Sequence, residues 1–113
     1  MTNMSHMRGP TDVLQALADP TRRAVFERLA EGEATVSQIT AGLDVSQPAV
    51  SQHLAALRRA GLVADRRSGR FVYYRAEPSG LAPLVDWIVQ YQNFWQSRIE
   101  RLSAVLQEID NQP

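Results

Sequence analysis

The sequence contains no cysteine, no lysine and no long apolar segment among its 113 residues. The absence of cysteine excludes disulfides, thiolate metal ligands, thiol redox switches and cysteine nucleophiles. No stretch reaches the roughly 18 consecutive apolar residues that a membrane-spanning helix requires. The first residues also lack the apolar region of a signal peptide, so we expect a cytoplasmic protein that does not associate with a membrane.

The composition is typical of a single globular domain, with 44% hydrophobic and 21% charged residues. A chain of this length can build one hydrophobic core. Residues 1–10 are polar and show no periodicity, which predicts a flexible N-terminal arm. We expect residues 11–113 to form one domain without internal repeats.

The formal net charge is zero, but the charges are unevenly distributed along the chain. Residues 1–45 carry a net charge of −2, residues 46–75 carry +5 and residues 76–113 carry −3. The central segment has six arginines and a single acid, Asp65. A basic segment between acidic flanks indicates a surface that binds an anionic partner such as nucleic acid.

Apolar periodicity and cap residues predict four helices in the first half of the chain. The first has Thr11 as its N-cap. The second has Asp19 as its N-cap and Pro20 at the first helical position, and it then runs over residues 22–30. A tight turn separates the third helix from the fourth, which predicts a helix-turn-helix at residues 36–60. The residues expected to begin and end these two helices are Thr35 with Gln38 as a capping box, Gly42 in a left-handed conformation, Ser46 and Gly61.

After the fourth helix the apolar period changes from about four residues to two. Residues 62–67 and 70–75 have the pattern of two strands joined at Ser68-Gly69, which predicts a β-hairpin over residues 62–76. From residue 79 to residue 109 apolar side chains recur every three or four positions, which predicts one long helix. The predicted fold class is therefore mainly α-helical with a two-stranded β-hairpin.

The helix expected at residues 47–60 contains no acidic residue. Val50, Leu54 and Leu57 form its buried stripe. Small residues on the opposite side would let this helix enter the major groove of DNA, where a glutamine such as Gln52 can pair with adenine N6 and N7. Its N-terminus also suits a phosphate group. An ordinary amphipathic helix with a neutral-to-basic solvent face explains the pattern equally well.

Three arginines surround the tip of the predicted hairpin: Arg66, Arg67 and Arg70. With only Asp65 nearby, their charges would repel one another unless an anionic group neutralises them, and phosphate is the natural candidate. A solvated polar turn is the alternative interpretation. Together, the basic hairpin and the acid-free helix favour double-stranded DNA as the partner.

Three segments resemble the ArsR-type (ArsR/SmtB) winged helix-turn-helix transcriptional repressors. They are Leu17-Ala18-Asp19-Pro20-Thr21-Arg22-Arg23, Ser46-Gln47-Pro48-Ala49-Val50-Ser51-Gln52-His53-Leu54 and Ala60-Gly61-Leu62-Val63. The resemblance implies a homodimer that pairs through its first and last helices. It also implies that the fourth helix reads the major groove of a palindromic operator while the hairpin, the wing, holds the phosphates. Repression would be relieved by an effector or a metal.

The chain departs from the metal-sensing members of that family. Those members carry cysteines in the third helix, or histidine together with carboxylates on the last helix. Here the third helix has no thiolate, and the last helix has carboxylates but no histidine. Carboxylates alone are a poor transition-metal site, so we expect no metal and no cofactor. A small-molecule effector is the remaining kind of regulator.

The candidate DNA-binding residues belong to the fourth helix and the wing. They are Ser46, Gln47, Pro48, Ser51, Gln52, His53, Arg58, Arg59, Arg66, Arg67 and Arg70. His53 has two interpretations, because it lies beside the buried stripe. It is either a half-buried packing residue or a DNA contact, and the resemblance favours DNA.

The last helix carries an aromatic patch of Trp87, Tyr91, Phe94 and Trp95. Apolar seams of this kind usually pack against a partner helix, so a dimer core is the favoured interpretation. An aromatic-lined ligand pocket between protomers is the alternative. The residues expected at the dimer interface are Val13, Leu14, Leu84, Trp87, Ile88, Tyr91, Phe94, Trp95 and Leu102.

The leading hypothesis is a sequence-specific, homodimeric DNA-binding repressor. A second hypothesis is a winged-helix module that docks a partner protein through the aromatic C-terminal helix, although the charge segregation argues against it. We do not expect an enzyme, because the sequence offers no nucleophile–base–orienter set, metal cluster or glycine-rich phosphate loop.

Overall fold

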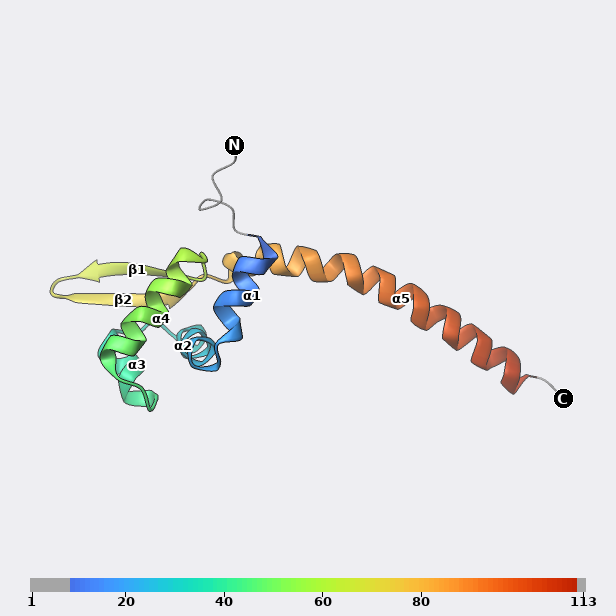
Figure 1. Cartoon of the computed structure of the whole chain (residues 1–113), viewed down its shortest axis with the longest axis horizontal. Helices are drawn as coiled ribbons and strands as arrows, with labels where there is room; N and C mark the ends of the chain where they lie inside the picture. The colour runs from blue at the N-terminus through green and yellow to red at the C-terminus, as the bar shows by residue number, and fades with distance from the viewer. Residues whose placement is uncertain (1–8, 112–113) are drawn as a thin grey trace, which may run out of the picture.

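The computed structural model describes residues 9–111. The elements in chain order are α1 (Pro10–Ala18), α2 (Pro20–Glu31), α3 (Val36–Gly42), α4 (Gln47–Arg59), β1 (Val63–Ser68), β2 (Phe71–Ala76), a short 3₁₀ helix (Pro78–Leu81) and α5 (Ala82–Asp110) (Figure 1). This arrangement confirms the predicted fold class, a helical protein with a two-stranded wing and a long C-terminal helix. The predicted N-terminal arm lies outside the described residues, apart from Gly9 and Pro10.

The first two helices begin at proline residues. The start of α1 differs from the sequence prediction, whereas the predicted N-cap of α2 is confirmed. Thr11 is not the N-cap of α1. Gly9 holds that position, and its backbone N–H donates to the Asp12 carboxylate at 3.1 Å. The second helix begins at Pro20, because Asp19 accepts hydrogen bonds from the backbone N–H groups of the next turn. Pro20 occupies the first helical position, as predicted, where a proline loses no helical hydrogen bond.

The predicted caps of α3 and α4 are confirmed, with one exception. Thr35 and Gln38 form the capping box at 3.2 and 2.9 Å, and the Ser46 hydroxyl accepts from the N–H of Ala49 at 3.3 Å. Gly42 does not adopt a left-handed conformation. It is the last residue of α3, and the following residue is extended. The tight turn is instead made after Gly42, where the backbone N–H of Val45 donates to the carbonyl oxygen of Leu43 at 2.9 Å.

The wing is an antiparallel pair in which Ser68 faces Phe71 and Arg66 faces Tyr73. Its turn is Gly69-Arg70, one residue later than predicted. Gly69 has a φ of 62°, and a glycine with positive φ at the first central position is typical of a type II′ hairpin turn. One further contact was not predicted. Ala34 pairs with Tyr74 through backbone hydrogen bonds of 3.0 and 2.8 Å, which connects β2 to the segment before α3.

The hydrophobic core lies between α1–α4 and the base of the wing. Its largest fully buried side chains are Ile39, Leu54, Leu57, Leu62, Val13, Val25 and Val50. The predicted stripe of α4 is confirmed, since Val50, Leu54 and Leu57 are at most 1% exposed. Burying such side chains stabilises the fold by roughly 1.5–3 kcal/mol each. The orientation of α4 is therefore determined by the core.

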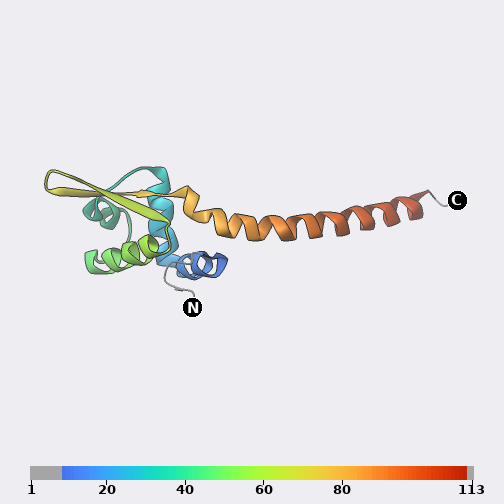
Figure 2. The same cartoon turned by 90° about the horizontal axis from the view of Figure 1, so that it is seen from above.

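The last helix extends away from this core. Figures 1 and 2 show α5 leaving the helical body opposite the wing, with no other element along most of its length. The molecule is 75 Å long as a result. Among the described residues of α5 none is buried, and only Leu84, near its start, packs against the core.

A contact between two glycines joins the 3₁₀ helix to the end of α4. A Cβ atom at Gly80 would lie 2.1 Å from the carbonyl oxygen of Gly61 and 3.2 Å from the Cα of Leu62. Both are backbone atoms, which cannot move aside as the end of a flexible side chain can. The 3₁₀ helix therefore packs directly on the end of α4, and this contact helps to set the direction in which α5 leaves the core.

Replacing Gly80 with alanine should destabilise the protein by about 1–3 kcal/mol, because the added methyl group would overlap the Gly61 backbone. Chemical denaturation measures this change in the free energy of unfolding. Gly42→Ala is the matched control, since no atom lies within 4 Å of its Cβ position. It should be neutral or stabilise by up to about 1 kcal/mol. A Gly80→Ala variant as stable as the wild type would contradict this packing.

Candidate nucleic-acid interface

The outer side of α4 is exposed and carries only neutral and positive side chains. Its exposed residues, including the N-cap, are Ser46, Gln47, Pro48, Ser51, Gln52, Ala55, Arg58 and Arg59. The side chain of Gln47 donates to the Ser37 hydroxyl at 3.3 Å, which joins the start of α4 to α3. Gln52 makes no such contact within the described residues. Its amide can therefore bind a base edge.

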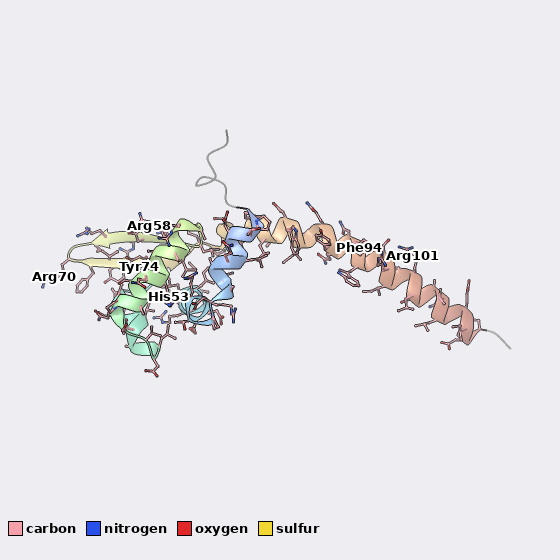
Figure 3. All side chains as sticks on the ribbon, in the orientation of Figure 1. His53, Arg58, Arg70, Tyr74, Phe94 and Arg101 are labelled. Carbon is pink, nitrogen blue, oxygen red and sulfur yellow. The ribbon has the colours of Figure 1, made fainter. Side chains whose placement is uncertain are left out.

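An open groove of about 450 Å³ runs between α4 and the wing. Its lining residues are Ser51, Leu54, Ala55, Arg58, Arg59 and Tyr74. Figure 3 shows Arg58 and Tyr74 on the two elements that form it, with Arg70 at the far end of the wing. The sequence analysis did not include Tyr74, because strand periodicity alone does not show which element a strand residue faces.

The two faces of the wing differ in what they contact. Successive residues of a strand point to opposite faces, so Asp65 and Arg67 share one face and Arg66 lies on the other. Asp65 bonds to Arg58 of α4 at 3.2 Å, and its cross-strand partner Tyr74 lines the groove. The face that carries Arg67 therefore turns toward α4, and the face that carries Arg66 turns away from it.

Arg66 is held by a residue that the sequence analysis missed. Its Nε and Nη2 atoms donate to the two carboxylate oxygens of Glu33 at 2.8 and 2.6 Å. The guanidinium also lies 4.7 Å from the centre of the Tyr73 ring. The prediction that Asp65 is the only acid near the hairpin was therefore wrong. Glu33 comes from a loop 33 residues earlier, and only the fold brings it to the wing.

The hydrogen bonds from Arg66 hold the pKa of the Glu33 carboxyl below its ordinary value, against an opposing effect of desolvation. The same bonds raise the pKa of Arg66. Arg58 is similarly paired with Asp65. In the part of the chain that the structure describes, the remaining candidate arginines, Arg59, Arg67 and Arg70, have no ion pair. These three can accept an external anion without giving up an internal partner.

His53 lies beside α2 rather than on the outer face of α4. It is half-buried, and its Nδ1 atom is enclosed without a hydrogen-bond partner among the described residues, as is the Nε atom of Arg22. Backbone N–H groups, chiefly that of Arg22, lower the pKa of Asp19, and the charge on His53 contributes to this lowering. Of the two interpretations of His53, this placement supports the half-buried packing residue.

The residues proposed for the dimer interface fall into two groups. Leu14 and the α5 residues Trp87, Ile88, Tyr91, Phe94, Trp95 and Leu102 are 43–59% exposed. Leu84 is partly buried against the core, and Val13 is completely enclosed within its own protomer. Val13 is therefore inaccessible to a second chain. The exposed apolar residues continue beyond the residues that we proposed, through Ile99, Val105, Leu106 and Ile109.

Among the described residues no three histidine, aspartate or glutamate side chains are grouped so that they could hold a metal ion. No helix among residues 9–111 is long and apolar enough to span a membrane.

Acidification should destabilise the fold through Asp19. A carboxyl whose pKa is lowered by folding stabilises the folded state above its unfolded pKa, ordinarily 3.8, and this stabilisation is lost as the pH falls through the lower folded pKa. Asp19→Asn retains an N-cap oxygen but cannot ionise. The wild type should therefore have the higher Tm at neutral pH, and the two values should converge as the pH falls below about 3.8. Thermal unfolding followed by circular dichroism measures both. If the Tm values of the two proteins kept a constant difference at all pH values, this role of the Asp19 carboxylate would be contradicted.

Comparison with known proteins connects this geometry to a family. The model of the bacterial regulatory protein arsR family matches residues 19–65, from the N-cap of α2 into β1. The HTH-type transcriptional regulator Rv2034 of Mycobacterium tuberculosis is 52% identical over 81 residues, which cover 72% of this chain and 76% of that protein. The arsenical resistance operon repressor of Escherichia coli is 35% identical over 107 residues, which cover 91% and 86% of the two chains.

A solved structure extends the match to the fold. The ArsR-like transcriptional regulator from Rhodococcus sp. RHA1 aligns with a TM-score of 0.71 at 28% identity, and the alignment covers 85% of this chain and 91% of that chain. Sequence and fold therefore agree over the helices, the wing and most of the chain. The protein belongs to the ArsR family of winged helix-turn-helix, DNA-binding transcriptional regulators.

Proposed function

We propose that this regulator is a homodimeric repressor that reads a palindromic operator with α4 and holds the DNA backbone with its wing. The main support for the proposal is that two surfaces suited to DNA face the same groove. The acid-free face of α4 and the Arg67 face of the wing border the same groove. A duplex placed there would present base edges to the helix and phosphates to the arginines.

Sequence readout is assigned to the exposed polar side chains on the N-terminal half of α4. Gln52 is central to this set because it is exposed, lies on the outer face and can form two hydrogen bonds with one adenine. Ser51 and Gln47 lie beside it on the exposed surface. The small Ala55 leaves room for the helix to approach the groove floor. Ser46 and Pro48, at the start of the helix, lie where backbone N–H groups favour a phosphate.

Backbone contacts are assigned to Arg59, Arg67 and Arg70, the arginines without an internal ion pair in the described chain. Two protomers would then neutralise about six phosphates. Since each phosphate contributes about −0.9, the slope of log K against log salt should be near −5 on double-stranded DNA. These contacts position the protein without carrying sequence information.

Dimerisation is assigned to the uncovered apolar stripe of α5. With residues 100° apart, most of its exposed apolar side chains fall on one side of the helix. An apolar surface of this length is typical of a protein interface rather than of a solvated helix. A second copy would cover it and relate two α4 helices by a twofold axis. The half-sites of the operator should then lie about 34–36 Å apart, or a multiple of that spacing.

Gln52→Ala should weaken operator binding by about 1–3 kcal/mol and leave binding to random DNA nearly unchanged, because it removes a base contact only. The operator is obtained by selection from a random duplex pool, and the dissociation constants are measured by fluorescence anisotropy. Gln107→Ala, an exposed glutamine on α5, is the matched control and should bind both DNAs like the wild type. Equal losses on operator and random DNA would remove Gln52 from the base-reading set.

Trp95→Glu should convert the dimer to a monomer, because Trp95 is 59% exposed at the centre of the α5 stripe and a charge there cannot be buried without cost. Light scattering coupled to gel filtration measures the mass. Asn93→Glu is the control: two residues correspond to about 200° round the helix, so Asn93 lies on the opposite side. That variant should remain dimeric. If the wild type is a monomer without specific DNA binding, the protein-interaction module is the better hypothesis.

A further inference from the structure

Arg66 differs from its neighbour Arg67 in every contact that it makes. Arg67 lies on the face of the wing that turns toward α4 and has no ion pair among the described residues. The Arg66 guanidinium lies on the opposite face, donates two hydrogen bonds to Glu33 and lies over the Tyr73 ring. The two arginines were predicted to be equivalent phosphate contacts, and the structure separates them.

We propose that Glu33 occupies Arg66 in place of a DNA phosphate, so that the wing holds DNA through Arg67 and Arg70 alone. This inference rests on the proposed DNA-binding function. A carboxylate and a phosphate offer the arginine fork the same pair of acceptor oxygens, and one guanidinium edge cannot serve both at once. Glu33 is therefore an intramolecular competitor that keeps one cation away from the DNA.

Backbone hydrogen bonds fix the positions of both Glu33 and Arg66. Glu33 immediately precedes Ala34, which is fully buried and bonded to Tyr74 of β2 in both directions. Arg66 is the cross-strand neighbour of Tyr73, whose ring lies under the guanidinium. The backbone does not have to be ordered for the contact to form, so the cost is limited to the rotamer freedom of the two side chains. The pair therefore persists although Arg66 is about half exposed.

Withholding one arginine should weaken binding to every DNA sequence and reduce its salt dependence. A phosphate contact strengthens binding to every sequence, and non-specific binding consists almost entirely of such contacts. An additional phosphate contact in each protomer would raise the affinity for random DNA without improving the reading of bases. Glu33 would then limit the sequence-independent affinity for DNA and its salt dependence, although it does not touch DNA.

The test measures the slope of log K against log salt on a random-sequence duplex for the full chain and its variants. Glu33→Gln releases Arg66, so the slope should become steeper by about 2 per dimer and random DNA should bind on the order of tenfold more tightly at low salt. Arg66→Ala should leave the slope of the wild type unchanged, whereas Arg67→Ala should reduce it by about 2. The double variant Glu33→Gln/Arg66→Ala should return to the wild-type slope.

Glu31→Gln is the matched control, because it removes the same charge from an exposed residue nearby that has no ion pair in the described chain. It should leave the slope unchanged. An unchanged slope for Glu33→Gln, equal effects of the two glutamine variants, or a reduced slope for Arg66→Ala would each overturn the inference. If Glu33→Gln does not fold, as circular dichroism would show, the comparison of Arg66→Ala with Arg67→Ala decides alone. Absence of salt-dependent DNA binding by the wild type would instead overturn the proposed function.

Discussion

Burial of one side of α4 is the constraint on which the candidate interface depends. Val50, Leu54 and Leu57 are enclosed by the other helices and the base of the wing, so rotation of α4 about its axis would expose apolar surface. This fixes Ser51, Gln52 and Ala55 on the outside. The same rotation leaves His53 half-buried on the side of α4 that lies near Asp19, the N-cap of α2. A single set of buried contacts thus determines both which side chains can reach a ligand and which cannot.

The charge distribution of the folded protein differs from that of the sequence. Six arginines in the central segment suggest a uniformly basic surface, but two of the candidate arginines have acidic partners within the protein. Asp65 pairs with Arg58 along the groove, and Glu33 pairs with Arg66 on the far side of the wing. The positive charge that remains without an ion pair in the described candidate set is on Arg59, Arg67 and Arg70. A net charge of zero is therefore compatible with a local cationic surface, because the acids lie elsewhere or neutralise particular arginines.

The long helix α5 is not stabilised by the hydrophobic core in the way that the other helices are. It contributes Leu84 to the core, and its other large apolar side chains are exposed in the isolated chain. Packing in the helical body cannot stabilise its distal part, so its stability and its orientation depend on whatever covers the stripe. In the proposed homodimer, this cover also sets the distance between the two α4 helices. The interface and the DNA-binding geometry are then parts of one arrangement.

The order of the elements, the α4 stripe, the caps at Asp19, Thr35 and Ser46, and the presence of the wing follow from the sequence itself. They depend on local properties, such as side-chain periodicity and hydrogen bonds within one helical turn, that any chain segment expresses without its neighbours. Three local predictions were wrong: the N-cap of α1, the left-handed conformation of Gly42 and the position of the hairpin turn. Each depends on which of several neighbouring residues supplies a particular backbone hydrogen bond. Only the tertiary structure decided the partners of Arg66 and Arg58, the position of His53 and the burial of Val13. These depend on which segments meet in space, and no local pattern records that Glu33 lies beside a strand 33 residues away.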